Sequence, residues 1–491
     1  MQQHTYAPLP AGDAPASSPS SRRQRSSTRS LALAAATLIL VLLASLHEPT
    51  RQRVISTAAS LWPVGKVDER ARMDARYKEM LAGVVMDPHR PPDRWSEYLV
   101  PGEQYLVTNF FGGQTNQLFH KLYALYAARE LGAVALLPSF VAIHFPGHTH
   151  RSIDAMYDMP RFYNLTGVRA FPLHRISRDG IQKTTTLEPL RLPCWTFTAY
   201  TKPDATWLPP PAASLNEYGI QLDYSWPDTE AVSTPSGQPV VLDDVLAFLS
   251  NRTRQASWIE QNRFRRLPHN RQHTSPAFDP ANIPPLTLDN PVQCVDALFY
   301  VRSGWSRMWE QIGQHLHFVG TVQQAAEDYL RILFEVPEGQ DVPPYISVHI
   351  RGTDFRTVHG SIPSTSFVNK VAEVRQLLAK RLADVESNMT RASAPRKTLL
   401  TAPENYPVVF TTDEQPTSTI WRELAAHGWK GVEHVRMNTT QRFDPWYPSL
   451  IDGAILAGAQ GMVGTALSTY SFVSGERVKS WQGGVYLEAK L

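Results

Sequence analysis

The stretch YLVTNFFGGQTNQLFHKLYALYAARELGAVALLPSF (105–140) decides the fold class. Its first six residues are an apolar run of strand type, a Gly-Gly turn follows, and apolar side chains then recur at helical spacing over 117–131. The run AVALLPSF (133–140) has the character of a second buried strand, closed by a proline. Strand, turn, helix and strand in this order form the building block of a parallel sheet. The sequence therefore predicts an α/β fold.

The second half of the chain repeats this alternation of strands and helices. We predict strands at YISVHI (345–350), PVVFTTD (407–413), GVEHVRM (431–437) and GMVGT (461–465). We predict helices at 319–335, 365–386, around Trp421, at 447–459 and from about 469. Two such series predict two Rossmann-like lobes, one over 100–300 and one over 301–491. Residues 200–292 are rich in proline, and we expect them to form long surface loops within the first lobe.

Composition excludes several classes of protein. The 491 residues include 48 basic and 45 acidic ones, and this net charge of +3 is too balanced to indicate a nucleic-acid-binding surface. Hydrophobic residues make up 42% of the chain, enough for a sizeable core. The two cysteines, Cys194 and Cys294, are too few for a disulfide scaffold or a Cys-rich zinc protein. One disulfide between them and two buried thiols are both open.

The N-terminus has the sequence features of a membrane-targeting segment. Residues 1–30 are rich in Ser, Pro and Gln with a cluster of arginines, and the uncharged run LALAAATLILVLLASL (31–46) follows. Arginines ahead of the run keep the N-terminus cytoplasmic. We predict a disordered cytoplasmic tail (1–30), a transmembrane signal-anchor (31–47) and a stem (48–99), as in a single-pass type II protein of the Golgi or ER. A cleaved signal peptide and a buried helix are the alternatives.

Glycosylation signals agree with a lumenal location for the rest of the chain. The motif Asn-x-Ser/Thr occurs four times, at Asn164, Asn251, Asn388 and Asn438. We therefore predict N-glycosylation at these positions.

Ligands of open parallel sheets bind beyond the carboxyl ends of the strands, so residues that follow strands are the candidates for a site. Gly112 and Gly113 follow the first predicted strand, and paired glycines let backbone N–H groups approach a ligand closely. The helix that begins there favours an anionic group, and Asn116 adds an amide. An ordinary strand-to-helix turn is the alternative interpretation.

A second cluster ends the strand 345–350. Arg351 directly follows this apolar strand, where a guanidinium is well placed to hold a diphosphate with two parallel hydrogen bonds. His349 lies two residues earlier. The alternative is a structural Arg351–Asp354 ion pair beside a core histidine.

A third cluster follows the strand 461–465. Ser468, Thr469 and Tyr470 open a helix, where hydroxyls and free backbone N–H groups form an anion cradle, unless Ser468 or Thr469 only caps the helix. Asp452 and Asp413 either accept hydrogen bonds from a purine base or ribose, or cap turns. The chain has no Walker A, G-x-S-x-G, H-E-x-x-H or D-x-D motif.

Taken together and in this order, the three clusters resemble the GDP-fucose protein O-fucosyltransferase family and its α1,6-fucosyltransferase relatives. The matching segments are NFFGGQTNQLFHKLYALYAARELGAVALLPSF (109–140), VHIRGTD (348–354) and IDGAILAGAQGMVGTALSTYSF (451–472). The resemblance implies a GT-B-like fold and an inverting, metal-independent transfer of fucose from GDP-fucose to a protein Ser/Thr or glycan hydroxyl.

The resemblance also implies roles for the candidate residues. Arg351 would bind the diphosphate and stabilise its departure, and His349 would contact the nucleotide. Asp452 would accept hydrogen bonds from guanine or ribose, and Ser468, Thr469 and Tyr470 would complete the cradle. Asn116 would lie near the sugar and the incoming hydroxyl, on the acceptor side.

Two departures from the family pattern are visible. The loop GGQTNQ (112–117) lacks the glutamate that some members offer as a base, so no general base is assignable. The segment HIRGTD has one arginine where relatives often have two. Two further functions stay open: a GT-B glycosyltransferase with another donor or acceptor, and a catalytically silent, lectin-like member of the fold.

Overall fold

The computed structural model of the chain describes residues 68–86, 95–108, 112–142, 149–175, 190–196, 215, 218, 220–223, 241–262, 291–296, 304–389 and 402–491. The chain divides into two compact units, and one of them includes all of Leu81–Leu491, which holds both predicted lobes and the end of the predicted stem. The predicted membrane anchor at 31–47 lies outside the described residues. Of the helices that are described, none is long and apolar enough to span a bilayer.

The first sheet has six parallel strands in the order β5-β2-β1-β8-β6-β7. Its strands are β1 (Tyr105–Thr108), β2 (Val134–Leu137), β5 (Ala170–Pro172), β6 (Leu190–Thr196), β7 (Ile220–Asp223) and β8 (Val292–Asp296). The chain first runs outward from β1 through β2 to β5, and later strands add on the other side of β1. Reversal of strand order beside the first strand is the switch point of a Rossmann-like sheet.

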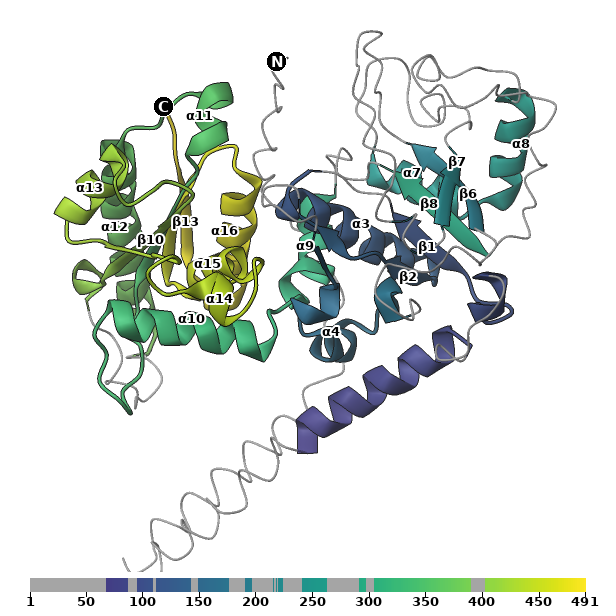
Figure 1. Ribbon diagram of the computed structural model, residues 1–491, viewed down its shortest axis with the longest axis horizontal. Coiled ribbons are helices and arrows are strands. Elements are labelled where there is room, and N and C mark those ends of the chain that lie inside the picture. The colour runs from purple at the N-terminus through teal and green to yellow at the C-terminus, as the bar shows by residue number, and fades with distance from the viewer. Residues whose placement is uncertain are drawn as a thin grey trace, which may run out of the picture. The chain divides into compact units, whose positions relative to one another are not determined.

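Helix α3 (Gln114–Leu131) connects β1 to β2 as the sequence predicts (Figure 1). It ends at Gly132, whose φ of +67° lies in the left-handed region that favours glycine at a helix end. Every residue from Thr115 to Ala128 is buried, because α3 lies against the sheet and also contacts α7 (Leu242–Leu249), α9 (Trp305–Gln311) and the C-terminal half of the chain. The segment that decides the fold class is therefore a core helix.

The prediction of loops over 200–292 is wrong in part. Strand β7, helix α7 and helix α8 (Arg252–Asn262) all lie within this range. Gln255 of α8 is fully buried, and its side-chain amide donates hydrogen bonds to the backbone oxygens of Phe248 and Leu249 and to Oε1 of Gln293 in β8, at 3.0–3.1 Å. Polar bonds of this kind carry no apolar periodicity, which is why the sequence pattern did not show α8, whereas the short helix α7 does have buried apolar residues at helical spacing.

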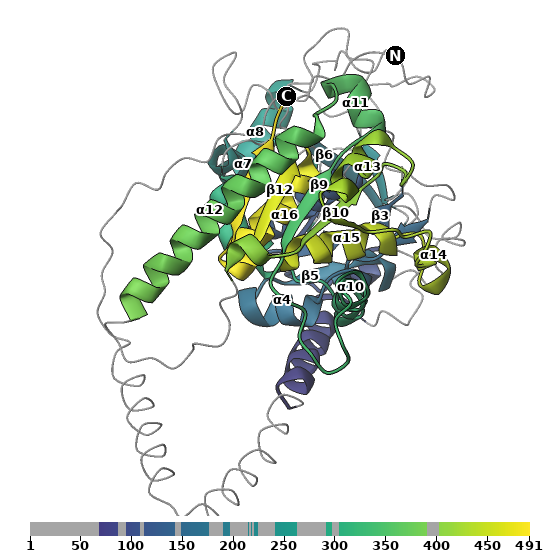
Figure 2. The ribbon, with the colours of Figure 1, turned by 90° about the vertical axis from the view of Figure 1, so that its left-hand side faces the viewer.

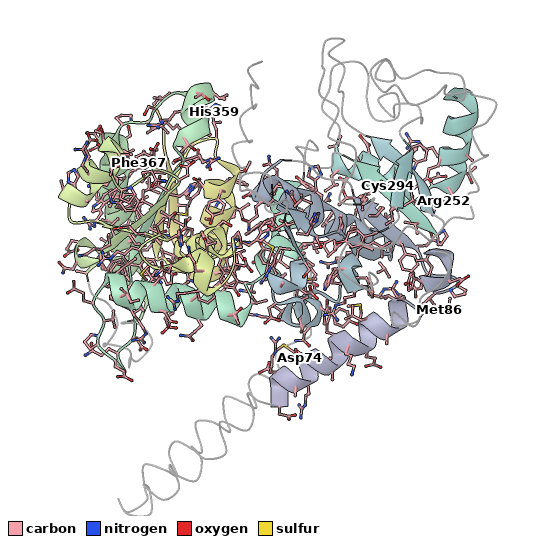
Figure 3. All side chains as sticks on the ribbon, viewed as in Figure 1. Asp74, Met86, Arg252, Cys294, His359 and Phe367 are labelled. Atoms are coloured by element: carbon pink, nitrogen blue, oxygen red, sulfur yellow. The ribbon has the colours of Figure 1, made fainter. Side chains whose placement is uncertain are left out.

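Cys294 lies at the centre of β8, and Figure 3 shows it near Arg252, the first residue of α8. Cys294 is disulfide-bonded, and the chain's other cysteine is Cys194, whose backbone lies opposite it in β6. The side chain of Cys194 itself lies outside the described residues, so its pairing with Cys294 stays a prediction.

The second sheet has five parallel strands in the order β11-β10-β9-β12-β13. Its strands are β9 (Ile346–Ile350), β10 (Val408–Thr412), β11 (Lys430–Gly431), β12 (Gly461–Thr465) and β13 (Val485–Ala489). Strand order again reverses beside the first strand, here between β9 and β12. Two parallel, Rossmann-like sheets in one chain confirm the predicted α/β class.

One predicted strand is wrong. The segment 431–437 alternates apolar and polar residues, but β11 ends at Gly431 and the chain then turns, with the N–H of Met437 bonded to the oxygen of Glu433. Val435 is 87% exposed, so its side chain has no core to face. Alternation alone does not make a strand where no neighbouring strand is available to pair with it.

Helices cover both faces of the second sheet. Val463 of β12 packs with the core under α12 (Ser364–Met389) and α13 (Thr419–Ala426), which includes Phe367 (Figure 3). Its neighbour Met462 points the other way, onto α15 (Tyr447–Gly458) and α16 (Thr469–Gln482). Figure 2 shows α12 running alongside β12.

Residues 68–84 form a helix ahead of the first sheet. Further helices and strands are β3 (Phe140–Val141), β4 (His150–Arg151), α4 (Met159–Thr166), α10 (Gly320–Leu333), α11 (Thr353–His359) and α14 (Thr439–Arg442). Of these, α10 confirms the helix predicted over 319–335.

Replacing Gln255 by leucine tests the observed packing of α8. The change should lower the free energy of unfolding by about 1–3 kcal/mol, because it keeps the volume but leaves buried acceptors without a donor. Urea denaturation measures the change. As the control, Gln324→Leu removes an exposed glutamine bonded only to Asp328 within α10 and should change stability by less than about 0.5 kcal/mol. Equal effects of the two substitutions would contradict the packing described for Gln255.

Candidate functional site

Arg351 leaves the carboxyl end of β9, the central strand of the second sheet, and its side chain is 27% exposed. Its guanidinium forms an ion pair with Asp413, the first residue after β10. The Asp413 carboxylate also accepts hydrogen bonds from the N–H of Gly352 and the hydroxyl of Thr353, both at 2.6 Å. We predicted that Asp413 either accepts hydrogen bonds from a purine base or ribose or caps a turn. In the structure it anchors the turn that follows β9. The side chain of Asp354, the partner in the alternative ion pair, lies outside the described residues.

A second carboxylate holds the same turn. Glu414 accepts a hydrogen bond from the N–H of Thr353 at 3.2 Å and pairs with Arg356 at 3.0 Å. A Cβ at Gly352 would lie 2.0 Å from the Glu414 carboxylate, so a larger residue here would have to displace the Glu414 side chain. The sequence analysis missed Glu414, although it stands next to Asp413 at the end of a predicted strand.

His349 is buried beneath this turn. Its Nδ1 lies 2.7 Å from the hydroxyl oxygen of Ser471, and its ring centroid lies 4.9 Å from that of Tyr470. Burial lowers the pKa of His349 to about 3; the Arg351 charge adds to this shift and Asp413 opposes it. The imidazole is therefore neutral at physiological pH and offers a hydrogen bond without a charge.

Thr465, the last residue of β12, fixes the carboxyl end of β9 from the other side. Its hydroxyl accepts a hydrogen bond from the N–H of Arg351 at 2.9 Å and donates one to the oxygen of His349 at 3.0 Å. The N–H of Thr465 donates to the hydroxyl of Ser471 at 3.0 Å. Thr465 and Ser471 were missed as site residues, because their roles depend on strand pairing.

The third predicted cluster forms the start of α16. Ser468 is its N-cap, and its hydroxyl accepts a 3.3 Å hydrogen bond from the N–H of Ser471, as the capping alternative requires. Thr469 is the first helical residue and is half-buried. The hydroxyl of Tyr470 donates to the backbone oxygen of Ser449. Leu467, just before the cap, has a φ of +67°, a strained value for a leucine that marks a tightly determined turn.

Asp452 of α15 is held by a histidine that the sequence analysis did not single out. Its Oδ1 lies 2.9 Å from Nε2 of His434, and Nδ1 of His434 lies 3.0 Å from the hydroxyl of Thr439. Thr439 is bonded in turn to the hydroxyl of Tyr329 at 2.5 Å. His434 lies in the segment mistaken for a strand, which is why its partner was not foreseen.

The glycine-rich loop of the first lobe is also tightly built. Gly112 has a φ of +76°, and a Cβ there would lie 2.6 Å from Nδ2 of Asn116. Gln117 donates to the oxygens of Gly112 and Val141 and accepts from the N–H of Val141, at 2.7–2.9 Å. Asn116 is buried, and its Oδ1 forms no hydrogen bond with any residue that the structure describes.

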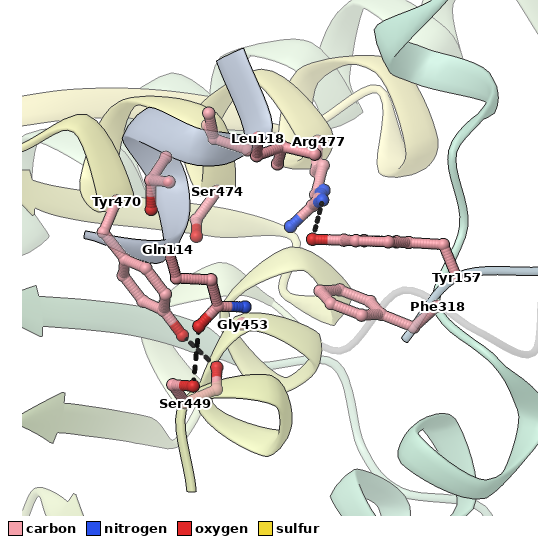
Figure 4. A pocket seen from close by; sticks show the side chains of 11 residues that line it. Gln114, Leu118, Tyr157, Phe318, Ser449, Gly453, Tyr470, Ser474 and Arg477 are labelled. Carbon is pink, nitrogen blue, oxygen red and sulfur yellow. Dashed lines mark hydrogen bonds between the residues drawn. The ribbon is translucent and has the colours of Figure 1, made fainter. Parts of the chain in front are cut away.

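One pocket joins this loop to the third cluster (Figure 4). Its lining residues are Gln114, Thr115, Leu118, Tyr157, Phe318, Ser449, Gly453, Tyr470, Val473, Ser474 and Arg477. Its empty space is about 270 Å³ when open solvent is counted, and the enclosed part has room for about one water molecule. Oε1 of Gln114 accepts a 2.7 Å hydrogen bond from Ser449, so α3 is bonded directly to α15. Of the predicted site residues, Tyr470 lines the pocket, whereas Arg351, His349, Asp452 and Asn116 do not.

The predicted modification sites that are described lie at the surface. Asn164, Asn251 and Asn438 are exposed, and Oδ1 of Asn251 accepts a 2.8 Å hydrogen bond from the N–H of Arg254. The side chain of Asn388 lies outside the described residues. Glycosylation at these positions stays a prediction. Among the residues described, no group of three or more His, Cys, Asp or Glu side chains could hold a metal ion.

Buried neutral histidines make stability depend on pH. Burial lowers the pKa of His349 and His120 to about 3 and of His317 to about 4, below the ordinary value of 6.5. The unfolded chain therefore binds more protons below pH 6.5, and the free energy of unfolding should fall as the pH falls from about 6.5 towards 4. His349→Asn should reduce the number of protons taken up on unfolding by up to one, so the free energy of unfolding should fall less steeply as the pH falls. Urea denaturation at several pH values measures this dependence. An unchanged pH dependence would contradict a buried neutral His349; His427→Asn is the exposed control.

Comparisons with known proteins find similar chains among solved structures, at low sequence identity. No protein-family model and no curated protein matches the chain. Among solved structures, it is similar to POFUT1 in complex with GDP-fucose, with 14% identity, a TM-score of 0.45, and coverage of 79% of this chain and 99% of that one. It is also similar to the fucosyltransferase NodZ from Bradyrhizobium, with 12% identity, a TM-score of 0.35, and coverage of 76% and 92%.

Proposed function

We propose that this chain is a glycosyltransferase that transfers fucose from GDP-fucose to a protein Ser/Thr or glycan hydroxyl, with inversion and without a metal ion. The observation that carries the proposal is the position of Arg351. It stands at the carboxyl end of β9, beside the switch point between β9 and β12, where parallel sheets bind nucleotides. The motif resemblance supplies the identity of the donor.

Arg351 would act on the leaving group. Breaking the bond between fucose and GDP places negative charge on the diphosphate while the sugar acquires oxocarbenium character. A guanidinium held in place stabilises that charge as it develops, without reorganising during the reaction. Asp413 keeps the guanidinium in place before the nucleotide arrives, and phosphate oxygens would then compete with this carboxylate or share the arginine with it.

The neighbouring residues would orient the nucleotide. His349 is neutral, so it would contribute a hydrogen bond and leave the positive charge to Arg351. Asp452, fixed by His434, would accept hydrogen bonds from guanine or ribose through its remaining oxygen. Thr469 stands at the N-terminus of α16, where the helix dipole favours phosphate.

The first lobe would present the acceptor. The amide oxygen of Asn116, which has no hydrogen-bond partner among the described residues, lies buried beside the glycine-rich loop and could accept a hydrogen bond from an incoming hydroxyl. The loop has no carboxylate, so stabilisation of the leaving group would supply most of the acceleration. We further propose a type II membrane topology with the lobes in the Golgi or ER lumen, on the strength of the apolar run 31–46 and the arginines before it.

Arg351→Ala should weaken the binding of GDP by about 10- to 100-fold, because a charge-assisted phosphate contact contributes about 1.5–3 kcal/mol. Calorimetry with the full-length chain in detergent, without divalent metal, measures the affinity. Arg422→Ala, which removes an exposed arginine of α13, is the matched control and should leave GDP binding unchanged.

The same preparation tests the donor and the metal. GDP-fucose should release GDP in the presence of EDTA. Binding of UDP in preference to GDP would refute the fucosyl donor, and loss of all turnover on chelation would refute the metal-free mechanism. Binding of GDP with no transfer to any acceptor would favour the lectin-like alternative.

Asp452→Asn separates recognition of the base from recognition of the phosphates. If the carboxylate accepts from guanine, whose Watson–Crick edge carries N–H donors, the substitution should weaken GDP about 10-fold or more and leave ADP and UDP unchanged. Arg351→Ala should weaken all three alike. If Asp452 binds ribose instead, Asp452→Asn should weaken every ribonucleotide and have little effect on 2′,3′-dideoxy-GDP. No loss with any nucleotide would exclude Asp452 from the site.

A further inference from the structure

Arg477 of α16 is a buried cation that no carboxylate neutralises among the described residues. Only 4% of its surface is exposed to solvent. Within the part of the chain that the structure describes, its guanidinium forms one hydrogen bond, in which Nη2 donates to the hydroxyl of Tyr157 at 3.5 Å, and Nε has no partner. A buried guanidinium with so few partners is costly, so the structure leaves a place for a negative group.

Aromatic rings surround this cation. The guanidinium carbon lies 4.5 Å from the ring centre of Phe318, 5.4 Å from that of Trp481 and 5.6 Å from that of Tyr157. Ring faces attract a cation and hold the guanidinium in one orientation. They do not supply the hydrogen-bond acceptors that its N–H groups require, so the rings position Arg477 without satisfying it.

The pocket in front of Arg477 is lined by further donors. Oε1 of Gln114 is occupied by Ser449, which leaves its amide N–H₂ to donate. In Figure 4 this amide nitrogen and the Arg477 guanidinium both point into the space between the lining side chains. Thr115 and Ser474 add hydroxyls to the lining.

The backbone favours a negative charge at the same place. Gln114 and Thr115 are the first two residues of α3, whose N-cap Gly113 offers no side-chain acceptor and whose first turn has no acidic residue. The helix dipole therefore adds positive potential to the pocket. No acidic residue lies among the lining residues.

The rest of the lining is apolar and determines the kind of anion. Leu118, Phe318 and Val473 line the pocket beside the donors. We propose that this pocket is a binding site for a small carboxylic acid, with its carboxylate on Arg477 and Gln114 and its hydrocarbon part against the apolar side chains. A planar carboxylate matches the planar guanidinium fork, and an apolar wall suits carbon better than a fully hydrated phosphate. Because Arg351 does not line the pocket, this site is separate from the proposed diphosphate contact.

Thermal unfolding of the full-length chain in detergent tests the proposal, with propionate as the probe. Saturating sodium propionate should raise the Tm by about 2–4 °C above sodium chloride of equal ionic strength. Propionamide, which has the same shape and no charge, should give no rise. Gln114→Ala should weaken the propionate effect about 10-fold, and Arg477→Met should abolish it. Arg351→Ala is the control that should retain it.

Crystals grown with 3-bromopropionate give a second measurement that does not depend on the variants' folding. In the wild type, the anomalous bromine peak should lie in this pocket. Equal stabilisation by propionamide, or a propionate effect that persists in Gln114→Ala and Arg477→Met, would overturn the proposal. Stabilisation by inorganic phosphate with none by propionate would replace the carboxylate by a tetrahedral oxyanion. If no anion binds and Arg477→Met unfolds at the wild-type Tm or above, Arg477 serves only the packing.

Discussion

The carboxylate of Asp413 is the interaction on which the candidate site depends. It holds the Arg351 guanidinium, the N–H of Gly352 and the hydroxyl of Thr353 at once. This arrangement follows from strand register, because Thr412 of β10 lies opposite Ile350 of β9 and the next residues along both strands must meet. A shift of the register by one residue would send the two side chains to opposite faces and separate the charges.

The opposite neighbour of β9 completes the arrangement. Thr465 at the end of β12 bonds to the backbone on both sides of Ile350, and through Ser471 it connects β9 to the start of α16. The carboxyl end of the central strand is thus fixed from both sides, and His349 is buried between them in its neutral form. A site held this way is preorganised for an anion, and the anion has to compete with Asp413 for the arginine.

Sequence patterns predicted those parts of this structure that depend on local chemistry. The apolar runs of β9, β10 and β12 and the helix after the Gly-Gly turn are visible in the residues themselves. Arg351 was predicted to be important because it follows such a run, but its partner lies 62 positions away and is determined by strand pairing. For the same reason His434, Thr465 and Ser471 escaped notice, and Gln255 holds a helix through polar bonds that no apolar pattern reveals.

Arg351 and Arg477, both in the second lobe, differ in the groups that surround them. Arg351 is about a quarter exposed and has a carboxylate partner, so a ligand has to displace or share an existing ion pair. Arg477 is nearly inaccessible and has aromatic rings in place of a carboxylate, so an anion that reached it would replace no protein group. Folding has already removed water from Arg477, so a ligand does not have to desolvate it. Separating Arg351 from Asp413, by contrast, costs free energy at the moment when the ligand binds. An anion of matching shape should therefore gain more from each hydrogen bond to Arg477 than to Arg351, although the smaller space around Arg477 restricts which anions fit.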